Sequence, residues 1–105
     1  MMYIIHIVKT KEHTDSVYCG RGSVLGNPFP ITQHASRNYV CDEYQIYFDE
    51  QIQINKIFMM ELVRIHTLGK RYGEVKLGCF CAPERCHTET IKKFLENNQE
   101  LLDSY

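Results

Sequence analysis

Three cysteines and a histidine fall within nine residues near the end of the chain, in segment 79–87. Thiols and an imidazole at such spacing can bind a metal, activate a nucleophile or pack in a core. A zinc site would use Cys79, Cys81, Cys86 and His87. The ligand types suit zinc, but structural zinc sites space their cysteines as paired C-x-x-C knuckles, and this segment does not. Zinc is therefore the alternative interpretation.

A nucleophilic interpretation pairs Cys86 with His87. Cys86 would lie at the start of a helix, where the dipole lowers a thiol pKa, and His87 would act as the base. Beyond Glu89, the sequence identifies no third group that orients the histidine. Cys79 and Cys81 are more simply explained as small buried residues. His87 is the residue of this segment that we expect to contact an anionic ligand or move a proton.

The glycine-rich segment 20–29 has the residues of an anion-binding loop. Glycines let backbone N–H groups converge, and Arg21 offers a bidentate fork for phosphate. The segment is neither a P-loop nor a dinucleotide fingerprint, because its GxGxxxG spacing matches neither motif. Asn27 before proline either orients a ligand or shapes a turn. The expected ligand-binding residues are Gly20, Arg21, Gly22, Ser23, Gly26, Asn27 and Arg37.

Together these segments resemble the DUF4326 family, small bacterial and phage proteins named as a domain of unknown function. The landmarks are GRGS and GNPF in segment 20–29, then Arg37, Tyr44, Gly69-Lys70, C-x-C at 79–81 and Cys86-His87. The family pattern continues with a small residue and an aspartate, where this chain has Thr88 and Glu89. The resemblance supports the choice of site and implies no established activity.

The surrounding sequence predicts the elements that position these residues. Alternation and turn signals indicate strands at 2–9, 16–19 and 75–81, the first of them central and covered on both faces, with a buried structural His6. Helical periodicity indicates a helix capped by Ser36 that breaks near 53–55, a second ending at Gly69, and a last one over 91–102. We expect Cys19 and Cys41 to be packing residues.

The order of these elements predicts a small α/β domain over residues 1–105, with a mostly parallel or mixed three-stranded, Rossmann-like sheet and helices packed on it. Both special loops would then follow strands at the carboxyl edge, where such sheets bind ligands. The net charge of -1 provides no general basic field for nucleic acid. With no apolar run of roughly 20 residues and no secretory signal, we expect a cytoplasmic protein that does not enter membranes.

These observations predict binding of a nucleotide or related phosphorylated small molecule, without a cofactor. Catalysis is left open by the sequence. If it occurs, cleavage or transfer at a phosphate ester or N-glycosidic bond fits best, with Asn27, His87 and Glu89 as the catalytic residues. The alternative is a zinc-containing module without catalysis that contacts protein or nucleic acid.

Overall fold

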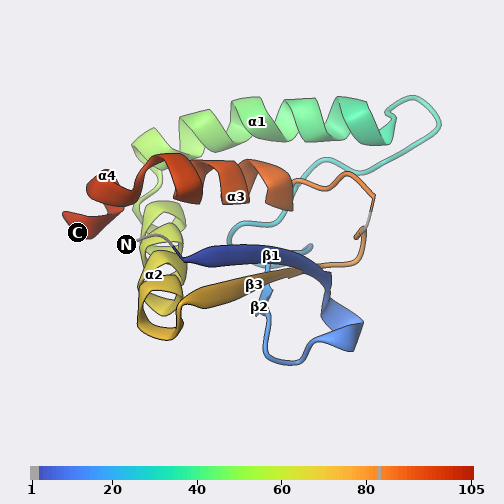
Figure 1. Cartoon of the computed structure of the whole chain (residues 1–105). Helices are drawn as coiled ribbons and strands as arrows, with labels where there is room; N and C mark the ends of the chain where they lie inside the picture. The colour runs from blue at the N-terminus through green and yellow to red at the C-terminus, as the bar shows by residue number, and fades with distance from the viewer. Residues whose placement is uncertain (1–2, 83) are drawn as a thin grey trace.

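The computed structural model describes residues 3–82 and 84–105. The first two strands are followed by α1 and α2, and the third strand is followed by α3 and α4 (Figure 1). The elements are β1 (Ile4–Lys9), the 3-10 turn η1 (Thr10–Glu12), β2 (Val17–Tyr18), α1 (Arg37–Ile54), α2 (Lys56–Tyr72), β3 (Glu74–Cys79), α3 (Thr88–Asn97) and α4 (Gln99–Asp103).

The three strands form an all-parallel sheet in the order β1-β3-β2. This confirms the predicted small α/β domain with helices packed on a three-stranded sheet. The prediction of a central first strand is wrong, because β3 takes the central place and β1 lies at an edge. Ile4 is 63% exposed, so β1 is not covered on both faces. Apolar content alone does not say how many neighbours a strand has. Residue 2 of the predicted strand lies outside the described residues.

His6 is also different from its prediction. It is half-buried rather than buried, and its Nε2 lies 2.9 Å from Oε1 of Glu74 on β3. The reason is the edge position of β1, because the His6 ring faces a surface on which the neighbouring strand presents a carboxylate.

Local capping explains where the first two helices begin. The Ser36 hydroxyl accepts a hydrogen bond from the backbone N–H of Tyr39 at 3.2 Å, as its N-cap position predicts. Asn55 ends α1 and caps α2, because its side chain accepts from the N–H of Phe58 at 3.1 Å. The predicted break between the two helices is confirmed.

The end of α2 lies later than the sequence indicated. The helix continues through Gly69 and ends at Gly73, which adopts the left-handed conformation with φ +78° and donates to the Gly69 carbonyl at 2.8 Å. Gly69 instead allows close packing, since a Cβ there would overlap the ring of Tyr3. The last helix is likewise divided into α3 and α4 at Asn98.

The helices form the core with one face of the sheet. In Figure 1, α3 lies over the sheet and α1 lies over α3, while α2 contacts both β3 and α1. The largest fully buried side chains include Tyr44, Phe48, Phe58, Leu62, Ile65, Leu77, Ile91 and Leu95. None of the helices in the described part of the chain is long and apolar enough to cross a membrane.

The parallel sheet brings the two special loops to one edge. Segment 19–29 leaves the carboxyl end of β2, and segment 80–87 leaves the carboxyl end of β3. The two strand ends are joined by a 2.9 Å hydrogen bond from the N–H of Cys19 to the carbonyl of Gly78. The loops therefore begin side by side.

Candidate functional site

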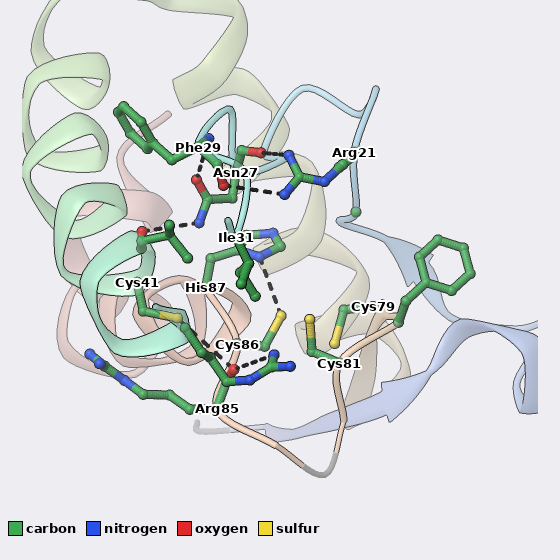
Figure 2. Close-up of a pocket in the computed structure, with 14 residues that line it drawn as sticks. Arg21, Asn27, Phe29, Ile31, Cys41, Cys79, Cys81, Arg85, Cys86 and His87 are labelled. Atoms are coloured by element: carbon green, nitrogen blue, oxygen red, sulfur yellow. Dashed lines mark hydrogen bonds between the residues drawn. The ribbon is translucent and has the colours of Figure 1, made fainter. Parts of the chain in front are cut away.

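The two loops and the start of α1 enclose a cavity of about 170 Å³ (Figure 2). The two sequence motifs thus meet in space, although residues 30–78 separate them along the chain. The predicted site residues that line this cavity are Gly20, Arg21, Asn27, Arg37, Cys79, Cys81, Cys86 and His87.

The remaining predicted residues of the glycine-rich loop shape it from outside the cavity. The Ser23 hydroxyl donates to the carbonyl of Gly20 at 2.6 Å, and the N–H of Gly26 donates to the carbonyl of Ser23 at 3.1 Å. Gly22 adopts a positive φ of 87°, and a Cβ at Gly26 would overlap the carbonyl oxygen of Gly20. These residues make the tight turn that presents Arg21.

Arg21 and Asn27 hold the second half of this loop. The guanidinium of Arg21 donates to the carbonyls of Asn27 and Phe29, at 3.1 and 3.2 Å. Asn27 is 8% exposed; its Nδ2 donates to the carbonyl of Val40 on α1 at 3.1 Å, and its Oδ1 accepts from the N–H of Phe29 at 2.9 Å. Asn27 therefore fastens the loop to α1 while it borders the cavity.

His87 lies at the start of α3 and reaches across to the other loop. Its Nε2 is 2.5 Å from the carbonyl oxygen of Cys19, and its ring lies edge-on to Tyr44, with centroids 4.9 Å apart. Tyr44 in turn donates to the carbonyl of Leu25 at 2.7 Å. The imidazole is thus buried between α1, α3 and the glycine-rich loop.

The other nitrogen of His87 faces a thiol. Nδ1 is 3.3 Å from Sγ of Cys86. Because the Cys19 carbonyl can only accept, Nε2 carries the proton, and Nδ1 of the neutral ring accepts from the Cys86 thiol. Burial lowers the pKa of His87 and the charge of Arg21 adds to this effect, while the hydrogen bond to Cys19 opposes it.

Two of the cysteines that line the cavity, Cys79 and Cys86, have thiol pKa values shifted in opposite directions. A hydrogen bond from Cys79 lowers the pKa of Cys86, and hydrogen bonds from the amide and hydroxyl of Thr88 act in the same direction, against the effect of burial. The pKa of Cys79 is raised by its hydrogen bond to Cys86 and by burial. Cys86 is therefore the thiol of this pair that ionises first.

Glu89 lies beside this site rather than in the cavity lining. Its Oε2 accepts from the backbone N–H of Cys86 at 3.1 Å, three residues back and just before the N-cap residue of α3. The Glu89 carboxylate thus secures the start of α3.

Three arginines line the cavity, and their partners differ. Nε of Arg37 lies 3.0 Å from Oε2 of Glu84, and Nη2 of Arg85 lies 2.9 Å from Oδ1 of Asp42. Arg21 donates to carbonyl groups and has no ion pair with a carboxylate among residues 3–82 and 84–105. Its charge is the least compensated of the three.

Some lining residues had no signal in our sequence interpretation. Cys41 is buried, as a packing residue would be, yet it also borders the cavity. Its position one helical turn after Arg37 could have indicated this, since residues i and i+4 share a face. The apolar lining residues Phe29, Ile31, Val40 and Phe80, together with Arg85, are brought in by tertiary structure.

The described residues also bear on the zinc interpretation. Within 3–82 and 84–105, no three His, Cys, Asp or Glu side chains are grouped so that they could hold a metal ion. Both nitrogens of His87 are engaged, by Cys19 and by Cys86. Zinc binding gains no support from this arrangement and stays a prediction for metal analysis.

Comparison with known proteins agrees with the motifs around the cavity. The profile of the family described as "Domain of unknown function (DUF4326)" matches residues 5–97, which include both loops. The chain belongs to the DUF4326 family. No curated protein and no solved structure matches the chain significantly. The cavity of this DUF4326 protein is therefore interpreted from its own residues.

Proposed function

We propose that this DUF4326 protein binds a phosphorylated small molecule, with nucleotides as the expected class. The observation that best supports this proposal is the state of Arg21, which lines the cavity. Within the described residues, this cation has no carboxylate partner, whereas Arg37 and Arg85 each have one. A guanidinium offers a charged fork of N–H donors to phosphate oxygens, which suits it to bind such a ligand.

The size of the cavity limits how the ligand would lie. About 170 Å³ is below the roughly 300–1,000 Å³ of pockets that bury most of a drug-sized ligand. A nucleotide would place one part inside and leave the rest at the mouth. Ile31 and Phe80 are 47% and 57% exposed there and offer apolar surface to a base.

Chemistry at the bound ligand is the second part of the proposal. Cleavage or transfer at a phosphate ester or N-glycosidic bond requires a group that moves a proton. His87 would do this through Nδ1, which contacts the Cys86 thiol, while Asn27 holds the loop that would orient the ligand and Glu89 holds the start of α3. In this proposal His87 moves the proton, and Asn27 and Glu89 hold the two segments between which the ligand would lie.

Thermal-shift titration tests the binding. AMP, ATP and ADP-ribose should raise the Tm in a concentration-dependent way, because a ligand that binds only the native state stabilises it, whereas adenosine should act more weakly. Arg21→Gln should weaken nucleotide binding at least about tenfold, consistent with the loss of one charge-assisted hydrogen bond.

The matched control is Arg71→Gln, which changes an arginine at the end of α2 that is not among the cavity-lining residues. Its nucleotide titration should overlay that of the unchanged protein. The proposal fails if no phosphorylated compound raises the Tm, or if Arg21→Gln and Arg71→Gln bind equally well.

A further inference from the structure

The cysteine next to His87 has the surroundings of an activated nucleophile. Such a site needs a nucleophile within hydrogen-bond reach of a base and a third group that orients the base. Sγ of Cys86 and Nδ1 of His87 are 3.3 Å apart, and the Cys19 carbonyl accepts from Nε2. All three parts are present, and the third is a backbone group that no sequence motif reveals.

The carbonyl of Cys19 matters for the proton as well as for orientation. It keeps the Nε2 proton in place, so the lone pair of Nδ1 faces Cys86 in the neutral ring. Once Nδ1 accepts the thiol proton, the same carbonyl stabilises the imidazolium through the Nε2–H. Cys19 is fully buried, which holds this contact away from water.

The position of Cys86 connects this pair to the ligand. Cys86 precedes α3 and lines the same cavity as Arg21 and Arg37. In Figure 2 its sulfur lies below the His87 ring, and a dashed line marks the contact between them. A phosphoryl group held in this cavity by Arg21 and Arg37 would therefore lie close to a sulfur nucleophile.

We propose that Cys86 attacks the phosphorus of a bound phosphate monoester and carries the phosphoryl group as a phosphocysteine. This inference rests on the proposed function and narrows it to the phosphate-ester reaction. Cys86 is the catalytic nucleophile, His87 is the acid and base, and the Cys19 carbonyl is a positioning group.

The step balances without an oxidant, reductant or metal. The Sγ electron pair forms the S–P bond, the thiol proton passes to Nδ1 of His87, and the P–O bond to the leaving alcohol breaks with its electrons. The leaving oxygen takes the proton from Nδ1. A water oxygen then attacks phosphorus, the S–P pair returns to Sγ, and one water proton reaches Sγ through His87, leaving phosphate and the free thiol.

Alkylation of the unchanged protein tests the nucleophile independently of nucleotide binding. We expect iodoacetamide at pH 7 to label Cys86 about tenfold faster than Cys81, because Nδ1 of His87 lies within hydrogen-bond reach of Sγ of Cys86, with sites identified by peptide mass spectrometry. Cys81 is a demanding reference because it is more exposed than Cys86 and lines the same cavity. Inorganic phosphate should slow the labelling of Cys86.

Turnover of p-nitrophenyl phosphate tests the reaction. Cys86→Ser should lower the release of p-nitrophenol at least about 100-fold and abolish acid-trapped phosphocysteine, whereas Arg71→Gln, which lies outside the cavity lining, should stay within about twofold of the unchanged protein. Far-ultraviolet circular dichroism and Tm check that both variants fold. No turnover by the unchanged protein, or turnover retained by Cys86→Ser, overturns the reaction.

The outcomes separate this inference from the proposed function. If nucleotides raise the Tm but Cys86 is labelled no faster than Cys81, the nucleophile is wrong and the binding function stands. If Cys86 is labelled fast but neither phosphate nor any nucleotide protects it or raises the Tm, the binding function and the phosphoryl step both fail.

Discussion

The imidazole of His87 on the start of α3 is joined to the backbone of Cys19 at the end of β2, with Nε2 2.5 Å from the carbonyl oxygen. This contact links the two loops that form the cavity and fixes the proton on Nε2. The carbonyl also gives the Nε2–H of the buried imidazole the hydrogen-bond acceptor that a buried polar group requires.

Replacement of His87 should lower stability and remove a pH effect. His87→Ala leaves the Cys19 carbonyl without its donor, at a cost of about 1–3 kcal/mol in urea unfolding. Because burial lowers the pKa of His87, the unfolded chain binds its proton more readily. Stability should therefore fall as pH drops below about 6.5, by at most about 1.4 kcal/mol per unit, and this contribution should be absent from His87→Ala.

The control for this series is His34→Ala, which changes an exposed histidine. The difference between the stability profiles of His34→Ala and His87→Ala across pH gives the contribution of His87 to stability. Parallel profiles for the unchanged protein and His87→Ala between pH 5 and 8 would contradict the prediction.

Asp103 fastens α4 to α2 through a chain of hydrogen bonds. Its Oδ1 lies 2.7 Å from both Nζ of Lys70 and Nε2 of His66, and Nδ1 of His66 lies 2.8 Å from the hydroxyl of Tyr3. The contact with Lys70, followed by that with His66, lowers the pKa of Asp103 to about 2 from an ordinary value of 3.8.

Asp103→Asn should therefore lower the Tm at neutral pH, and the difference from the unchanged protein should shrink as pH falls from about 4 to about 2. The sign follows because a depressed carboxyl pKa stabilises the fold only while the carboxylate is ionised. Glu100→Gln, at an exposed position of the same helix, should leave the Tm nearly unchanged. A constant difference across this pH window would argue against the prediction.

Gly69 tests the packing of α2 against β1. A methyl group there would overlap the ring of Tyr3, so Gly69→Ala should destabilise the protein by about 1–3 kcal/mol even though alanine favours helix. Thr67→Ala, at an exposed position of the same helix, is the control. Equal urea midpoints for the two variants would show that Tyr3 moves aside freely.

Asn27→Ala should loosen the glycine-rich loop. The substitution removes the hydrogen bonds to Val40 and Phe29, and the buried Val40 carbonyl loses its side-chain donor. We expect a loss of about 1–3 kcal/mol and faster amide exchange at Phe29. Asn97→Ala, at an exposed position near the end of α3, should change neither quantity. Unchanged exchange at Phe29 would mean that Arg21 alone holds the loop.

Metal analysis of the purified protein tests the zinc alternative. We expect far less than one zinc per chain and no loss of helical signal with chelator, since structural zinc binding is coupled to folding. About one zinc per chain, removed together with the fold, would favour the binding module over the ligand pocket.

Hydrophobic periodicity and turn residues were sufficient to predict most of the helices and strands from the sequence. The Ser36 cap, the break at Asn55 and the parallel α/β class all follow from local patterns. The end of α2 did not, because Gly69 and Gly73 are both plausible helix ends in sequence. Only the contact of Gly69 with Tyr3 distinguishes a packing glycine from a capping one.

By itself, the sequence determined which segments carry the chemistry, because cysteines, histidine, glycines and arginine at those spacings are visible without a fold. Tertiary structure decided how they are used. Strand order placed β3 in the centre and brought both loops to one edge, and the carbonyl of Cys19 set the tautomer of His87. A backbone carbonyl has no signature in sequence, so the contact of His87 with Cys19 became apparent only from the folded chain.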